Sequence, residues 1–264
     1  MWSKIVLVLR IVAVVWAIVL AVALFLASQG KIELSPDLEA AGWVISIIII
    51  GVDNAGTIAR RKANSDRNRL RTDIDQAVLP MLTQMSETGS VRFEHLGASV
   101  YVCKKRWWWP SDKPKEIRRI RRVRPSNFPT RTGVRWTTKS GQVGASHSGS
   151  IVVYTDWHAA GLEWRKHRSR LDPRTAFDEL DESVRGSHSY EEFTAAAGRY
   201  SEIIAIPLFD PSRDSTVIGV LTIDRAFIAE STDYKPFLDT QVAERIYAGP
   251  QELVASILNP AASS

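Results

Sequence analysis

Apolar residues are unevenly distributed along the chain, and the two longest apolar runs lie near the N-terminus. The run from Ile5 to Ala27 contains one charged residue, Arg10. As a helix this run rises about 34 Å, at about 1.5 Å per residue, which is enough to cross the hydrocarbon core of a bilayer. A second apolar run, from Ala40 to Val52, reaches a comparable length when it is extended to Ala59. We therefore expect a membrane anchor of two transmembrane helices, over about 5–27 and 40–59.

Charged residues beside these two runs predict how the anchor is oriented. Lys4 and Arg10 lie at the N-terminal side of the first run, and a basic cluster follows the second run, from Arg60 to Arg71. Because basic flanks stay on the cytoplasmic side, we expect a two-span protein of the cell membrane with both termini in the cytoplasm. A cleaved signal peptide is the alternative for the first run, but the run is longer than the apolar segment of such peptides.

Apolar positions recur every three or four residues between Leu70 and Met85, which predicts an amphipathic helix. Pro80 lies inside this helix, and Gly89 is expected to end it. Its apolar side serves either core packing or a parallel dimer contact, since some positions keep a seven-residue spacing. The sequence thus predicts a basic juxtamembrane and connecting helix over 60–90, followed by a cytoplasmic domain over 91–264.

Strand-like and helical patterns alternate from residue 96 onward. Strands are predicted where β-branched and apolar residues concentrate, and helices where apolar spacing lengthens: strands at 98–103, 150–154, 203–209 and 217–223, and helices within 159–197 and over 238–258. The segment 117–124 fits neither pattern, because its apolar residues are three positions apart among arginines. This succession of strands and helices predicts an α+β fold.

Two apolar segments near the C-terminus carry a family resemblance. Residues 200–210 read Tyr-Ser-Glu-Ile-Ile-Ala-Ile-Pro-Leu-Phe-Asp, and residues 217–224 read Val-Ile-Gly-Val-Leu-Thr-Ile-Asp. This pair resembles the last strand pair of a GAF domain, and the strings 133–136 and 141–145 with the strand up to Asp156 resemble the middle of the same fold. The resemblance covers about 70–258. It implies an antiparallel sheet with helices on one face that hold a ligand pocket.

In the GAF family the segment after the third strand and the helices that follow it face the ligand. The resemblance therefore points to six candidate ligand-binding residues: Asp156, Trp157, His158, Trp164, Phe177 and Tyr200. For each of them, a place in an ordinary aromatic core is the alternative. The cyclic-nucleotide signature is missing after the last strand, and Cys103, the single cysteine, has no neighbouring histidine. Cyclic-nucleotide binding, bilin binding and methionine-sulfoxide reduction are therefore disfavoured, and the sequence identifies neither the ligand nor a cofactor.

Composition adds that charge is strongly segregated. The chain of 264 residues has a formal net charge of +5, but residues 60–170 carry a net charge of +15 and residues 171–264 a net charge of −9. The basic part contains a run of lysines, arginines and three tryptophans, and then an arginine-rich segment. The candidates for contact with an anionic membrane surface are Lys104, Lys105, Arg106, Trp107, Trp108, Trp109, Arg118, Arg119, Arg121 and Arg122. A solvated strand beside an aromatic-capped loop and a nucleic-acid site are the alternatives, with nucleic acid the least favoured.

Residues for catalysis are sparse. The five histidines form no His-Glu-x-x-His motif, and neither Gly-x-Ser-x-Gly nor a phosphate-binding loop is present. One cysteine cannot form an internal disulfide or a cysteine metal cage. We therefore expect no enzymatic activity and no bound metal.

These observations favour a membrane-tethered sensory module that binds a small cytoplasmic ligand. Because no kinase, cyclase or DNA-binding module is recognisable after the last helix, we expect it to signal through a homodimer or a separate output protein. One alternative is a ligand-activated effector whose two helices assemble and permeabilise the bilayer. Another is a membrane scaffold that binds no ligand.

Overall fold

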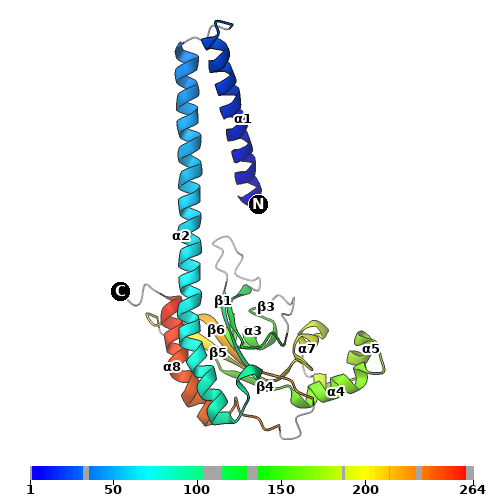
Figure 1. Cartoon of the computed structure of the whole chain (residues 1–264). Coiled ribbons are helices and arrows are strands. Elements are labelled where there is room, and N and C mark those ends of the chain that lie inside the picture. The colour runs from blue at the N-terminus through cyan, green and yellow to red at the C-terminus, as the bar shows by residue number, and fades with distance from the viewer. Residues whose placement is uncertain are drawn as a thin grey trace. The chain divides into compact units, whose positions relative to one another are not determined.

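The molecule comprises two compact units, Met1–Arg69 and Leu70–Ser264. The computed structural model describes residues 2–31, 36–103, 115–129, 136–185, 188–213, 215–229 and 234–259. One long helix, α2, belongs to both units, and every strand lies in the second unit (Figure 1).

The first unit consists of helix α1 (Trp2–Ser28) and the N-terminal part of helix α2 (Pro36–Gly89). The expected pair of membrane spans over 5–27 and 40–59 is wrong: in the described part of the chain, no helix is both long and apolar enough to cross a bilayer. The segment 40–59 is not a separate helix, because α2 continues from it into a long polar stretch. The same finding contradicts the expected location, which was the cell membrane with two spans.

Helix α2 enters the second unit as its first element. Apart from Leu79, which is 40% exposed, its apolar positions from Ile74 to Met85 are fully or almost fully buried, which confirms that this side of the helix packs in a core. The helix continues through Pro80 and ends at Gly89, as the sequence predicted. The short 3₁₀ helix η1 (Phe93–His95) then leads into the sheet.

A six-stranded antiparallel sheet forms the centre of the second unit, with strand order β3-β2-β1-β6-β5-β4. The strands are β1 (Leu96–Cys103), β2 (Glu116–Val123), β3 (Trp136–Thr137), β4 (Val153–Asp156), β5 (Tyr200–Phe209) and β6 (Val217–Ala226). This arrangement, with helices beside the sheet, confirms the expected α+β fold with an antiparallel sheet and flanking helices. The two longest strands, β5 and β6, pair along their whole length and are the strands that the sequence pattern marked most clearly.

Six further helices flank the sheet. They are α3 (Gly141–Gly149), α4 (His158–Arg168), α5 (Pro173–Asp178), α6 (Glu182–Arg185), α7 (Tyr190–Ala196) and α8 (Gln241–Leu258). The predicted helical region 159–197 is thus divided into four short helices. The C-terminal helix predicted over 238–258 forms as α8, but the interruption expected at Gly249 and Pro250 is wrong, because α8 passes through Pro250.

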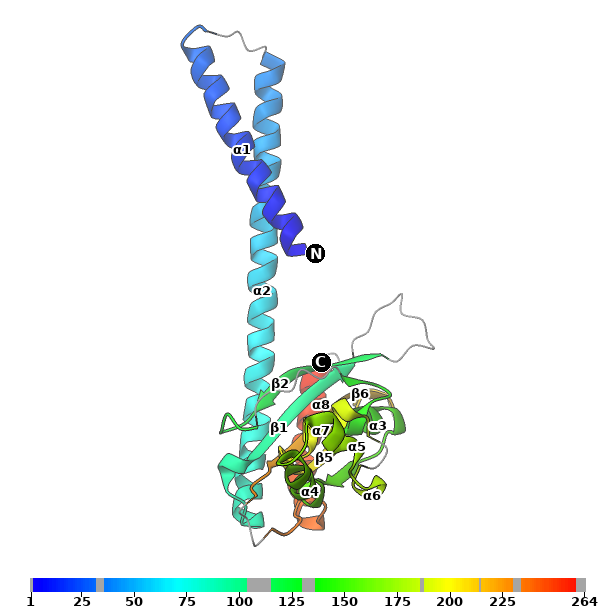
Figure 2. The same cartoon turned by 90° about the vertical axis from the view of Figure 1, so that its right-hand side faces the viewer.

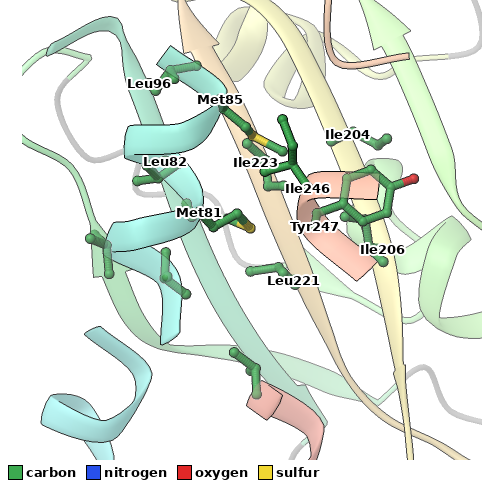
Figure 3. Close-up of a cluster of buried hydrophobic side chains, with 14 of the residues drawn as sticks. Met81, Leu82, Met85, Leu96, Ile204, Ile206, Leu221, Ile223, Ile246 and Tyr247 are labelled. Carbon is green, nitrogen blue, oxygen red and sulfur yellow. The ribbon is translucent and has the colours of Figure 1, made fainter. Parts of the chain in front are cut away.

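The main hydrophobic core lies between one face of the sheet and helices α2 and α8 (Figure 3). Met81, Leu82 and Met85 of α2 pack with Ile246 and Tyr247 of α8 in this core. Its sheet side consists of inward-facing strand residues, including Ala98, Val100, Ile204, Ile206, Leu221 and Ile223. Since side chains alternate between the two faces of a strand, the intervening residues of β1, β5 and β6 face the opposite side.

Helices α3 to α7 lie on that opposite side of the sheet (Figures 1 and 2). Helices α4, α5 and α7 have an aromatic core of their own, centred on Phe193, which is fully buried. The Phe193 ring lies 5.4 to 5.8 Å, centroid to centroid, from the rings of Phe177, Trp164 and Trp157. Edge-to-face contacts of this kind fix the short helices, which are too brief to be stable alone.

Candidate functional site

A small cavity of about 60 Å³ lies on the sheet face turned away from α2 and α8. Its sheet wall is polar, with Ser99 and Tyr101 from β1 and Thr222 and Asp224 from β6. These residues alternate along β1 and β6 with residues of the main hydrophobic core. Because successive side chains of a strand point to opposite faces, one face of the sheet packs in that core and the other face lines the cavity. The facing wall is formed by the start of α3, by α7, and by Trp157 and His188 from the connections between elements.

Helix α3 begins at the cavity. Its first three residues, Gly141, Gln142 and Val143, all line the cavity. Gly141 has φ of 59°, and a Cβ atom there would lie 2.4 Å from the Trp136 ring, so only glycine fits this position. Ser140 at the N-cap gives the helix no side-chain hydrogen bond, because its hydroxyl accepts from the backbone N–H of Thr137 instead. The first turn of α3 thus presents uncapped N–H groups, which favour a negatively charged or acceptor group.

Two buried side-chain donors of the cavity wall are unsatisfied. Trp157 is 3% exposed and Gln142 is 9% exposed. Neither the indole Nε1 of Trp157 nor the amide Nε2 of Gln142 has a hydrogen-bond partner among the described residues. A buried donor without a partner costs about 1–3 kcal/mol, so two of them beside one cavity are an expensive arrangement.

Charged side chains around the cavity are mostly compensated. Asp224 forms a buried ion pair with Arg124, and burial lowers the pKa of Arg124 to about 10. Glu192 accepts a hydrogen bond from the backbone N–H of Ser189 in a capping box at the start of α7. Arg119 also lines the cavity, on β2 opposite Tyr101. Burial raises the pKa of the Tyr101 hydroxyl, which keeps it protonated and able to donate.

His188 gives the cavity a neutral aromatic wall. Burial lowers the pKa of its imidazole, so the neutral form prevails at pH 7. Its ring centroid lies 4.9 Å from the ring of Trp157. The neutral imidazole has one donor and one acceptor nitrogen, so it can complement either kind of ligand atom.

The six predicted ligand-binding residues do not gather at one place. Trp157 and Tyr200 line the cavity. Phe177 lies in the aromatic core of the short helices, and Trp164 lies there and also lines a separate groove. Asp156 and His158 lie together outside the cavity, and both contact a residue that the sequence did not suggest.

That residue is Tyr234, whose ring is stacked on His158 with 3.9 Å between centroids. The Tyr234 hydroxyl donates a hydrogen bond of 2.8 Å to Asp156. Ser201 Oγ lies 3.5 Å from Nδ1 of His158, but it is buried and also donates to the carbonyl of Ala226. Asp156 accepts from the backbone N–H of His158. This cluster therefore lacks the accessible hydroxyl and the base oriented by a carboxylate that a nucleophilic site needs.

The basic candidates divide into two groups. Lys104, Lys105, Arg106, Trp107, Trp108 and Trp109 lie outside the described residues. In β2, Arg118 is exposed and Arg119 lines the cavity. Arg121 forms an ion pair with Asp75 of α2, and Arg122 donates to the carbonyl of Pro129. Arg119 is also hydrogen-bonded to the side chain of Tyr101, so three of the four described arginines make contacts within the molecule.

Sequence reasoning missed Gln142, His188 and Asp224 as residues around the cavity. Gln142 lies in α3, whose glycines, serines and single valine give no helical periodicity. The one available signal was the weak similarity of 141–145 to the middle of a GAF domain. Across the described ranges, no group of three or more histidine, cysteine, aspartate or glutamate residues is placed to hold a metal ion.

Comparison with known proteins gives a distant similarity of fold. No protein-family model matches the chain, and no curated protein sequence matches it. The free methionine-R-sulfoxide reductase of Neisseria meningitidis, solved with its substrate, is 16% identical over 76% of this chain and 90% of that chain, with a TM-score of 0.34. A candidate GAF sensor protein from Burkholderia vietnamiensis is 13% identical over 73% of this chain and 92% of that chain, with a TM-score of 0.32.

Proposed function

We propose that the unit Leu70–Ser264 is a GAF-like sensory module that binds a small molecule in the cavity between the sheet and helices α3 and α7. The unsatisfied donors of Trp157 and Gln142 carry this proposal. A ligand oxygen that accepts from either donor would remove a desolvation cost of about 1–3 kcal/mol.

The volume of the cavity limits the size of the ligand. A volume of about 60 Å³ is several times the roughly 10–15 Å³ that one water molecule requires. The bound group is therefore compact, about four to six non-hydrogen atoms. A carbonyl or carboxylate oxygen would lie at the N-terminus of α3, with its remaining atoms against Val143, Ile203 and Ala196.

Binding would add contacts between elements that come from separate parts of the chain. The ligand would bridge the sheet to α3 and α7, and would reduce the independent motion of these short helices. A homodimer or a separate output protein would then respond to the more rigid state. Signalling through a homodimer or through a separate output protein stays a prediction, and so does the absence of enzymatic activity.

The proposal is tested on the full-length chain. Mass spectrometry of the denatured purified protein would identify small molecules bound at near one-to-one ratio, and calorimetric titration with acetate and pyruvate would test compact carboxylates directly. Trp157→Phe and Gln142→Met each remove one donor, and we expect each to weaken binding about tenfold, the equivalent of 1.4 kcal/mol.

Gln76→Met, at an exposed position of α2, is the matched control and should leave binding unchanged. Two results would overturn the proposal. One is that no molecule co-purifies and neither acid gives a saturable heat. The other is that binding is insensitive to both cavity substitutions.

A further inference from the structure

A second concave site lies among the short helices, away from the cavity. It is an open groove of about 380 Å³ between the C-terminal half of α4, the start of α5 and the helix α7. Buried Trp164 and Ala197 lie at its base, and Tyr190 and Pro173 lie beside them. This volume is within the range of about 300–1,000 Å³ that small-molecule sites occupy.

Positive charge dominates the lining of this groove. Arg165, Arg168 and Arg199 line it, and none of the described lining residues is acidic. The nearby carboxylates of Glu163 and Asp178 form ion pairs with Lys166 and Arg174, which lie outside the lining. Among the described residues, neither Arg165 nor Arg168 forms an ion pair, and like charges three positions apart on a helix repel each other, which reduces the stability of α4.

Aromatic rings hold the two arginines of α4 in place. The guanidinium carbon of Arg165 lies 4.9 Å from the ring centroid of Phe227, and that of Arg168 lies 5.8 Å from the ring of Trp164. Stacking occupies the face of a guanidinium and leaves its in-plane N–H groups available. Both side chains are therefore partly ordered before any ligand arrives, which lowers the entropy lost on binding.

The third arginine comes from a different element. Gly198 has φ of 69°, and a Cβ atom there would lie 3.3 Å from Cδ1 of Trp164. This left-handed turn lets the chain after α7 pass close to Trp164 and brings Arg199 to the groove. Basic residues in the last turn of α4 also stabilise the helix through its dipole, which is a second reason for arginines at that place. Arg199 lies outside α4, so the helix dipole does not explain its position. Cations thus converge on one groove from two separate segments.

We propose that this groove binds a small oxyanion with two or more negative charges, of the phosphate or polycarboxylate class. Arginine forks pair with two oxygens of one phosphate or carboxylate group, and Arg165 and Arg168 lie on the same face of α4. Arg199 lines the same groove from a separate segment of the chain. The proposal is independent of the cavity ligand, because the two sites share no lining residue.

The test is calorimetric titration of the full-length chain with sodium pyrophosphate and, separately, sodium citrate, at constant ionic strength. The double variant Arg165→Gln, Arg168→Gln should weaken binding at least tenfold. Saturable binding of either anion with this dependence supports the site, and the comparison of the two shows whether phosphate or carboxylate is preferred.

Arg170→Gln is the matched control, because Arg170 is exposed just beyond α4 and does not line the groove. It should change the affinity less than twofold, and circular dichroism melting should show all variants folded. The proposal is overturned if neither anion gives saturable binding, or if Arg170→Gln weakens binding as much as the double variant. It is also overturned if Trp157→Phe abolishes anion binding, since the anion would then occupy the cavity.

Discussion

Glu202 and Arg225 face each other on the neighbouring strands β5 and β6 and form a buried ion pair, with 3.1 Å between Oε1 and Nη1. The Glu202 side chain is fully buried. Its second oxygen accepts hydrogen bonds from the backbone N–H groups of Phe237 and Leu238, at 2.7 and 2.8 Å. One carboxylate thus joins the sheet to the segment that leads into α8.

Removal of this charge should destabilise the fold. Glu202→Gln leaves Arg225 without a counter-ion in a largely buried position, and breaking a buried pair in this way costs about 3–5 kcal/mol. Urea denaturation at pH 7 measures the change in the free energy of unfolding. Glu163→Gln, which breaks an exposed pair with Lys166, should change it by less than about 1 kcal/mol. Equal effects of the two substitutions would contradict this interpretation.

Stability should fall as the pH is lowered from 7.5 to 5.5. Burial lowers the pKa of His188 in the folded state, whereas in the unfolded chain the pKa is near 6.5. The unfolded state therefore binds more protons as the pH falls through this window, which favours unfolding. Urea denaturation at pH 7.5, 6.5 and 5.5 should show a smaller decline for His188→Gln than for the unaltered chain. A decline as steep for His188→Gln as for the unaltered chain would contradict this assignment.

Two glycines should respond in opposite ways to alanine. Gly141→Ala forces a left-handed conformation on alanine and places a methyl group against the Trp136 ring, so we expect a loss of at least about 1–2 kcal/mol. Gly249 lies inside α8 with open space around it, so Gly249→Ala should add about 0.5–1 kcal/mol. Thermal melting of both variants measures the difference, and a gain for Gly141→Ala would refute the close contact at Trp136.

Phe193 should be the most sensitive position among the short helices. Its fully buried ring contacts three other aromatic rings, and Phe193→Ala should cost about 3–5 kcal/mol. Phe209→Ala, at the partly exposed end of β5, should cost much less. Near-ultraviolet circular dichroism should also lose signal for Phe193→Ala, because Trp157 and Trp164 lose an ordered neighbour. Retention of that signal would show that the aromatic core does not depend on Phe193.

The sequence predicted best the elements whose buried residues recur at a regular spacing. Strands β5 and β6 each contain an apolar run that is buried on both faces, and α8 keeps a helical period that overrides Pro250. Strand β2 escaped prediction because it contains a bulge. Val100 pairs with Arg121 and Tyr101 pairs with Arg119, which leaves Ile120 as the additional residue.

The bulge explains the spacing of three among the apolar residues of β2. Ile117 packs with Tyr101 on the cavity side of the sheet, whereas Val123 packs in the core with α2 and α8. An inserted residue changes which face the following positions occupy, so a strict alternation is lost. A pattern search that assumes one unbroken period cannot recognise such a strand.

The cavity was harder to predict than the fold, for a geometric reason. Trp157 and Tyr200 could be nominated because they lie near the segments that resemble a GAF domain. Gln142 and Asp224 are 82 positions apart in the chain, and only the pairing of β6 with β1 and the packing of α3 on the sheet bring them to one cavity. Local sequence carries no signal for this kind of convergence.

The strand order of the sheet has a consequence for synthesis on the ribosome. Its two central strands, β1 and β6, pair residues as distant as Leu96 and Arg225, which are 129 positions apart. Closing so long a loop is slow, and it cannot begin until β6 has left the ribosome. Until then β1 has an open edge that could pair with other chains. We therefore expect nascent chains that stop before residue 217 to need chaperones, and full-length chains to complete the sheet only after translation has almost ended.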